Sequence, residues 1–509
     1  MPQGNLSYQY QTLKKITPFT RYAGLPLYLD LMYATGLLDA IQQHLQARTG
    51  RQGWTDAQLV LSLILLNLID GHSISDIELL AQDKGLCRLV TYLEQHEFKH
   101  SSDSNHPARW RKNKLRTFPS ASAIFDFLKR FDAPEQDAFR TPNTAFIPTP
   151  KDVLGRLQSL NKILLNFAQQ HAPQTIATLD QDATLVPTYK RQALFCYQHF
   201  KAYQPLNTYW FEQGLLVHSE FRDGNVPAGF DELRVLKEAL QQLPASVKKV
   251  YLRTDGAGYQ KELLRYCAEG QDERFGVIEF AISADVNSEF KKAVLTVKEQ
   301  QWSPLYEEVN GSFLLTQQEW AEVCFVPNSI GPTKNKSTYR FMAIREPLKQ
   351  VDRNLDEFSF PVLTMKEHPY KLFGIITNRL HLHGDEVIHW HRQRCGKSEE
   401  LHKTEKEDLA GGRLPSKRFG ANAAWWQIMV LAFNLEAILQ RQILEDEFKY
   451  CHLKRLRRYF INQPAHVIIH GRTLIIRCPD DQTALVQWLV AMRARVLCLG
   501  QPPPVVQLG

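Results

Sequence analysis

Apolar residues recur every three or four positions in two stretches near the start of the chain. They are LYLDLMYATGLLDAIQQHL, residues 27–45, and LVLSLILLNLI, residues 59–69, which follows the capping sequence TDAQ. This spacing predicts amphipathic helices and hence a helical module over residues 24–94. The second stretch is well short of the roughly 18 apolar residues that would span a membrane, so we expect no membrane partner. The pattern does not tell whether these apolar faces form an internal core or an interface.

From residue 175 the pattern changes to strands. TIATLDQDATLVP and TYWFEQGLLVHSEF predict a pair of strands, and a helix is expected at 231–242. VKKVYLRTD then predicts a strand, KELLRYCAE a helix and FGVIEFAIS another strand. This order predicts a mixed α/β sheet in residues 119–289.

The rest of the chain divides by the same criteria. Residues 290–380 contain short β-rich runs, RFMAIRE and LFGIITN, and predict an inserted β-rich subdomain. Helical spacing returns over 381–440, where GANAAWWQIMVLAFNLEAIL is strongly apolar, and 441–509 predicts a small basic α+β region. With a helical domain at 1–118, the predicted fold is an α/β protein with an N-terminal all-α domain.

The length and composition indicate a multidomain globular protein, and the net charge favours an anionic partner. The 509 residues are 44% hydrophobic and 23% charged, ordinary globular values, and the formal charge is +7. The eight cysteines show no metal-ligand or redox spacing, and the start of the chain lacks a signal peptide, so we expect reduced thiols and an intracellular protein. Basic residues gather in two runs: Arg109, Arg111, Lys112, Lys114 and Arg116, and then Lys454, Arg455, Arg457 and Arg458.

Acidic residues at two strand ends are the first candidates for chemistry. Asp180 and Asp182 share one face of a predicted strand, because alternate residues of a strand point the same way. Asp255 follows another apolar strand and precedes two glycines, Gly256 and Gly258, that permit close approach. Crowded carboxylates favour a shared divalent cation. The alternatives are a strand end with two solvated acids for Asp180 and Asp182, and a turn aspartate for Asp255.

A third candidate is the charged segment at residues 392–412, RQRCGKSEELHKTEKEDLAGG. On a helix, Glu399, His402, Lys403 and Lys406 share one face. An acid that binds metal beside cations that bind phosphate suits such a face. The alternative is a solvated helix with ion pairs.

Taken together, Asp182, Asp255 and Glu399 in this order resemble the RNase H-like catalytic domain of DDE transposases. The chain looks like the bacterial insertion-sequence group that carries a tyrosine, arginine, glutamate, lysine signature. The signature lysine lies seven residues after the glutamate, which favours Glu399 with Lys406 over Glu400. The arginine of the signature would fall at the position of Cys395. The nearest arginine, Arg394, lies one residue earlier.

The resemblance implies an enzyme that cuts and rejoins DNA, with Asp182, Asp255 and Glu399 holding two Mg²⁺ ions, for which Mn²⁺ could substitute. It implies phosphate contacts from Arg394, Lys403 and Lys406 and a displaced base stacked on Trp390. Terminal inverted repeats and target DNA are the expected partners, with Arg111, Lys112 and Arg457 contacting DNA. A homodimer on paired ends is expected, in the bacterial cytoplasm and at the nucleoid when bound to DNA.

Two other functions fit parts of the sequence. LDQDAT also fits a haloacid-dehalogenase-like magnesium-dependent phosphatase, with Asp180 as nucleophile and Asp182 as acid/base. The crossover to a parallel strand that such a fold needs is not predicted after this motif. A non-catalytic DNA-binding protein derived from a transposase is the other alternative.

Overall fold

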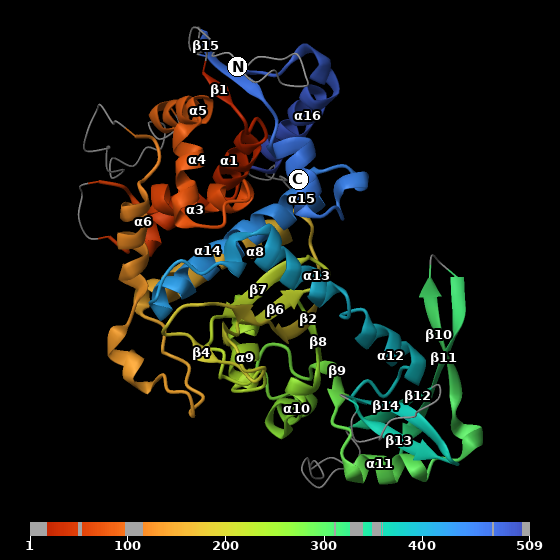
Figure 1. The fold of residues 1–509 in the computed structure, drawn as a ribbon. Helices are drawn as coiled ribbons and strands as arrows, with labels where there is room; N and C mark the ends of the chain where they lie inside the picture. The colour runs from red at the N-terminus through yellow and green to blue at the C-terminus, as the bar shows by residue number, and fades with distance from the viewer. Residues whose placement is uncertain are drawn as a thin grey trace, which may run out of the picture. The chain divides into compact units, whose positions relative to one another are not determined.

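The computed structural model describes residues 18–48, 53–96, 116–309, 312–325, 339–348, 358, 360–470 and 473–500 (Figure 1). The chain forms two compact units. Unit 1 consists of residues 1–127 and 439–509, and unit 2 of residues 128–438. The domain boundaries that the sequence predicts, at residues 118, 289, 380 and 440, remain predictions.

Unit 1 is mainly helical, as the apolar spacing predicts. Its longer helices are α1 (Leu25–Ala34), α3 (Asp56–Leu68), α5 (Lys84–His96) and α16 (Thr483–Leu499). Thr55 caps α3 in a capping box with Gln58, so TDAQ acts as the predicted start signal. The apolar side chains of α3 are all buried, so this helix belongs to the internal core of unit 1. Strands β1 (Phe19–Thr20), β15 (Ala465–His470) and β16 (Thr473–Arg477) form a small sheet.

Unit 2 contains a mixed sheet of ten strands in the described part of the chain, which confirms the predicted α/β class. Its centre is β2 (Ile176–Ala183), with β8 (Lys249–Thr254) parallel to it on one side and β6 (Leu206–Trp210) antiparallel on the other. Strand β9 (Glu279–Ala284) continues parallel to β8, and β7 (Leu215–Glu220) pairs with β6.

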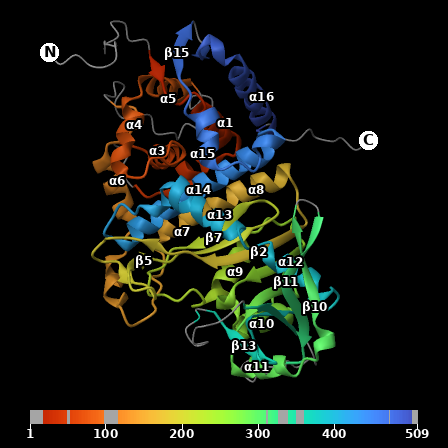
Figure 2. The ribbon, with the colours of Figure 1, turned by 45° about the vertical axis from the view of Figure 1, so that its right-hand side comes forward.

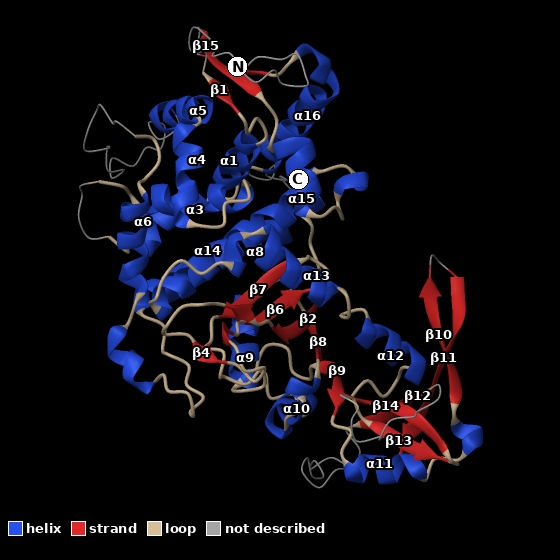
Figure 3. Ribbon diagram, in the orientation of Figure 1, coloured by secondary structure: helices blue, strands red, loops and turns tan. Residues whose placement is uncertain are grey.

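Helices lie on both faces of this sheet (Figures 1 and 3). Helices α8 (Asn161–His171) and α14 (Phe419–Ile438) lie on one face, and α9 (Glu232–Gln242) and α10 (Lys261–Ala268) on the other. Asn434 bonds the backbone N–H and carbonyl of Leu216, and Gln427 donates to the Ser219 carbonyl. These amides satisfy the free edge of β7, which would otherwise be open to pairing.

The strands of residues 290–380 extend the same sheet (Figure 2). Strand β14 (His368–Thr377) pairs with β9 and with β12 (Arg340–Pro347), so the runs LFGIITN and RFMAIRE are strands as predicted. A long hairpin of β10 (Ser303–Val309) and β11 (Ser312–Val323) was not predicted. Strand β13 (Val362–Met365) pairs with β14, and α11 is Ser288–Leu295. Within the described residues, no helix is both long and apolar enough to cross a bilayer.

Candidate active site

The register of β2 and β8 brings two predicted acids together. Asp180 pairs with Arg253 and Gln181 with Thr254, so Asp182 and Asp255 follow side by side at the carboxyl ends of two parallel strands. Asp255 also accepts the backbone N–H of Ala257 at 2.9 Å and so caps the turn that follows. This edge is where open α/β sheets bind ligands. The predicted meeting of the two acids is therefore a feature of the fold.

Asp180 is committed elsewhere. Arg253 donates to both of its carboxylate oxygens, at 2.6 and 2.7 Å, and both side chains are buried. Arg253 also donates to the backbone carbonyl of Trp390 at 2.7 Å. With both oxygens bonded to a buried guanidinium, Asp180 is less suited than Asp182 to act as a nucleophile or a metal ligand. The geometry therefore favours Asp182 over Asp180 as the site acid. It also opposes the phosphatase alternative, as does the antiparallel pairing of β6 with β2, because that fold needs a crossover to a parallel strand.

The two acids of the site differ in their electrostatic surroundings. Burial raises the pKa of Asp255, and the negative charge of Asp182 raises it further. Burial alone would raise the pKa of Asp182 as well, but contacts with His402 and Arg394 outweigh it and hold the pKa below its ordinary value. Arg394 Nη2 lies 3.2 Å from Asp182 and His402 Nε2 lies 3.5 Å from it. In this state protein cations balance the charge of Asp182.

A ring of polar side chains surrounds Asp182, and sequence reasoning identified it only in part. Helix α13 (Lys397–Lys403) supplies His402, whose Nδ1 lies 3.3 Å from Glu405. Glu405 is fully buried and accepts two hydrogen bonds from Asn207 Nδ2, at 2.8 and 3.0 Å. Asn207 is the strand partner of Asp182 across β2 and β6, which closes the ring. Burial would lower the pKa of His402, but its two carboxylate neighbours raise it to about 9.

Glu232 is a further acid that sequence reasoning missed. It begins α9, accepts a hydrogen bond from Thr254 Oγ1 at 3.1 Å, and is 1% exposed. Its second carboxylate oxygen is buried without a hydrogen-bond partner. Burial raises the pKa of Glu232 to about 7, with further contributions from the charges of Asp255 and Asp182. An acid at the first turn of a helix behind a strand gives no distinctive sequence signal.

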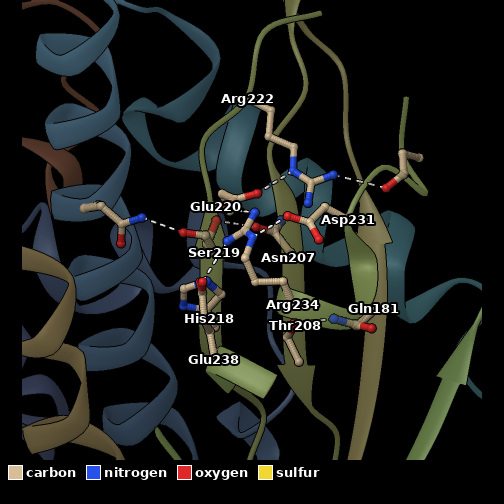
Figure 4. Close-up of polar contacts among 12 residues, drawn as sticks. Gln181, Asn207, Thr208, His218, Ser219, Glu220, Arg222, Asp231, Arg234 and Glu238 are labelled. Atoms are coloured by element: carbon tan, nitrogen blue, oxygen red, sulfur yellow. Dashed lines mark hydrogen bonds and ion pairs between the residues drawn. The ribbon is translucent and has the colours of Figure 1, made fainter. Parts of the chain in front are cut away.

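An ion-pair network holds the start of α9 against β7 (Figure 4). Arg222, fully buried, donates to Glu220 at 2.7 Å, and Arg234 of α9 contacts the other Glu220 oxygen at 2.6 Å. His218 and Glu238 form a second pair at 3.1 Å, also between β7 and α9. Ser219 donates to Asn207 at 2.6 Å, so the same strand supports the polar ring around Asp182. These contacts fix β6, β7 and α9 behind the acid pair.

The signature residues of α13 and the turn after it lie at this edge but are not joined into a metal site. Glu399 and Lys403 are exposed, and Glu400 pairs with Lys397 at 3.0 Å. Lys406 Nζ lies 3.4 Å from the Leu185 carbonyl oxygen. Within the described residues, no three His, Cys, Asp or Glu side chains are grouped closely enough to hold a metal ion. Asp182 and Asp255 suit a hard divalent cation, but a third ligand is not beside them.

Other residues predicted to contact DNA have different surroundings. Trp390 is half-buried, and the guanidinium groups of Arg379 and Arg253 lie 4.3 and 5.4 Å from its ring centroid, so base stacking on this ring stays a prediction. Arg457 is buried in unit 1, where it bonds Leu68, Asn67 and Asp70 at the end of α3, which favours a structural role over a DNA contact. Arg111 and Lys112 lie outside the described residues.

Comparisons with known proteins identify the family of the chain. The family model of the transposase DDE domain, group 1, matches residues 19–487. No curated protein sequence matches the chain. Among solved structures, a piggyBac transposase in a synaptic complex with hairpin DNA is similar at 10% identity, with a TM-score of 0.42 over 97% of this chain and 86% of that chain. The family match spans more than nine-tenths of the sequence, and the chain therefore belongs to the group 1 DDE transposases.

Proposed function

We propose that this transposase uses Asp182, Asp255 and Glu399 to cut and rejoin DNA. Its natural element is a bacterial insertion sequence that moves by cut-and-paste. The observation that carries the proposal is the register of β2 and β8, which sets Asp182 and Asp255 side by side at the carboxyl edge of the sheet. The arrangement supports an RNase H-like catalytic domain made of residues 119–289 and 381–440. Residues 290–380 are then its insertion, and 1–118 and 441–509 serve DNA recognition and assembly.

The acid pair has the chemistry of a divalent-cation site. The charge of Asp182 raises the pKa of Asp255, and a hard cation would stabilise both carboxylates. Oxygen ligands suit Mg²⁺, with Mn²⁺ as a substitute. Asp182 and Asp255 would hold this metal, with Glu399 as the third carboxylate that the family resemblance implies. Two bound ions would supply an activated oxygen nucleophile and stabilise the leaving oxygen. The protein's own part is to hold these carboxylates at one edge.

The cations of the same edge are suited to the DNA backbone. Arg394 is 7% exposed, and its Nε is buried without a hydrogen-bond partner. When the Asp182 charge is balanced by metal, Arg394 becomes available to a phosphate at the point of cleavage. Lys403 is exposed and Lys406 half-buried on the segment that follows, and their charge supports a role in binding phosphates beside it. This division assigns positioning of the DNA to Arg394, Lys403 and Lys406.

The test uses three alanine variants of the full-length protein. Asp182→Ala, Asp255→Ala and Glu399→Ala are each expected to abolish Mg²⁺-dependent cleavage while retaining binding to DNA carrying the element ends. Glu400→Ala is the matched control, because Glu400 is the adjacent acid and pairs with Lys397 on the helix surface. Cleavage is mapped to nucleotide resolution on flanking genomic DNA. Full activity in Asp182→Ala would contradict the assignment.

We infer the assembly on DNA from the one candidate acid triad that the sequence offers. Excision requires both ends to be processed, so we expect a homodimer on paired terminal inverted repeats, with the two-fold symmetry of the ends matched by the protein. Target DNA then joins this complex, in the bacterial cytoplasm at the nucleoid. Light scattering with and without two end duplexes, at low and high salt, measures the stoichiometry. Coupled cleavage of both ends by a single chain at every concentration would refute the dimer.

A further inference from the structure

The hairpin of β10 and β11 carries exposed apolar side chains in its outer part. Figure 1 shows the hairpin reaching past helix α12 (Gly384–Arg392). At its base, Leu305 is fully buried in a cluster with side chains of this helix. Further out, Tyr306, Leu314 and Leu315 are 44%, 53% and 66% exposed. A two-stranded ribbon is marginally stable in water by itself, so apolar side chains on it favour a covering partner.

The register of the hairpin places these side chains on both of its faces. Tyr306 lies opposite Leu315, and Glu307 lies opposite Leu314. Side chains directly opposite each other share a face, and successive residues of a strand alternate between faces. One face of the outer hairpin therefore has an apolar pair, and the other has a leucine beside a carboxylate. Exposed tyrosine and leucine side chains at one place are typical of a surface that binds protein.

The charge of this region opposes contact with DNA. Between Lys298 and Lys334 the sequence contains five glutamates and no lysine, arginine or histidine. Arg392 of α12 acts electrostatically on Glu307, but its Nη2 donates to Gln318 at 2.7 Å. A surface with this charge repels phosphates, so we look for its partner among proteins that present cations.

Unit 1 presents such cations at α15 (Leu453–Leu456) and the turns on either side of it. The exposed side chains there are three cations and two aromatic rings, which we call the α15 surface: Lys454, Arg455, Arg458, Tyr450 and Tyr459. Arg455 lies 5.6 Å from the ring centroid of Tyr459. No aspartate or glutamate occurs in the sequence between Glu447 and Asp480. The α15 surface is therefore complementary to the outer hairpin in charge, and both include exposed rings.

Resting on the proposed homodimer, we propose that the outer hairpin of each copy binds the α15 surface of the other copy. Glu307 lies among the cations, and Tyr306 and Leu315 cover the tyrosine rings. Two such contacts related by a two-fold axis close the assembly at two chains. Direct pairing of two β10 edges does not fit, because it would bring the glutamates of both copies together. The cations of the α15 surface then serve assembly of the protein, and the contact needs no DNA.

The experiment mixes two charge-reversal variants of the full-length protein, without DNA or metal, and measures dimers by sedimentation velocity and light scattering. Glu307→Lys/Glu308→Lys and Lys454→Glu/Arg455→Glu should each weaken the dimer tenfold or more, because like charges meet at both contacts. An equimolar mixture should recover the dimer. In the mixed pair the altered hairpin meets the altered α15 surface, and the natural hairpin meets the natural one, so opposite charges meet at both contacts.

Matched controls reverse exposed charges elsewhere in unit 2. Glu262→Lys and Lys261→Glu, both at the start of α10, should leave the dimer unchanged. Leu315→Ser tests the apolar part of the contact and should weaken the dimer with no recovery in either mixture. Thermal unfolding reports whether each variant folds, and recovery in the mixture itself shows that both charge-reversal variants are folded.

Three results would overturn the proposal. They are a parent that stays monomeric without DNA, charge-reversal variants that dimerise as the parent does, and folded variants whose mixture stays monomeric. If the Glu307→Lys/Glu308→Lys variant keeps its dimer but loses affinity for an end duplex, the hairpin binds DNA, which also overturns it. Asp182→Ala separates this proposal from the proposed chemistry, because it should lose cleavage and keep the dimer. A parent that cuts DNA but is monomeric without it contradicts the hairpin contact alone.

Discussion

Arg253 holds both carboxylate oxygens of Asp180, at 2.6 and 2.7 Å, in the interior of the sheet. Two residues further along β2, Asp182 is open to solvent over 23% of its side chain. One strand thus carries a structural aspartate and a candidate catalytic one, and these roles predict different consequences of mutation.

Replacing Asp180 by Ala should destabilise the protein, because it leaves a buried guanidinium without its partner. Breaking a buried pair in this way costs about 3–5 kcal/mol. Chemical denaturation measures the loss, with Glu400→Ala as the control that should change stability far less, because its partner Lys397 is exposed. Equal loss of stability in both variants would contradict the division of roles.

Glu232 gives the folded protein a distinct pH dependence in the absence of metal. Its pKa rises from 4.5 to about 7 on folding, so between these values the folded state binds more protons than the unfolded state. The free energy of unfolding therefore falls as pH rises from 4.5 to about 7. The ionisation of Glu232 lowers it by on the order of 3 kcal/mol in total.

Glu232→Gln should remove that dependence and make the variant more stable than the parent at pH 8. The difference between parent and variant is the quantity to measure, by denaturation in EDTA from pH 4.5 to 8. His391 contributes the opposite slope, because burial lowers its pKa to about 3, and this contribution cancels in the difference. A difference that does not vary with pH would show that Glu232 has an ordinary pKa.

The contact between Asn207 and Glu405 should support cleavage through the position of His402. Asn207→Ala removes both donors from a fully buried carboxylate and should cost about 2 kcal/mol in stability. It should also lower the cleavage rate more than it lowers DNA affinity, because it disturbs the segment beside Asp182. Thr208→Ala, on the same strand and bonded to Gln181, is the control for stability loss alone. Equal cleavage rates per folded molecule in the two variants would contradict a role of Asn207 in positioning His402.

Lys403 and Lys406 should each contribute one phosphate contact. Replacing either by Ala is expected to reduce the slope of log affinity against log salt by about 1, equally for specific and unspecific DNA. Binding titrations at several salt concentrations measure the slope, with Lys449→Ala as a control, because Lys449 pairs with Asp446 in unit 1. If Lys406→Ala binds the element ends and cleaves DNA normally, Lys406 does not have the role that the signature predicts for its lysine.

The sequence alone determined the local elements, and it offered Asp182 and Asp255 as candidate acids. Strand alternation and helical spacing are properties of neighbouring residues, so β2, β8, α9 and α14 could be placed from pattern. The family resemblance predicted that Asp182 and Asp255 share one site, and the register of β2 and β8 sets them side by side. The hairpin of β10 and β11 escaped prediction, because its sequence does not alternate cleanly between apolar and polar residues.

Only the tertiary structure decided which polar residues are free to act. Asp180 and Asp182 look alike in sequence, but the register of β2 against β8 gives Asp180 a partner 73 residues away. Arg457 is one of several arginines in a basic run, yet its guanidinium is bonded to a helix end almost 390 residues earlier. Glu405 looks like a surface acid and is fully buried on Asn207, 198 residues distant. Local periodicity carries no information about such pairings, because burial and hydrogen bonding between distant segments arise only when the chain packs.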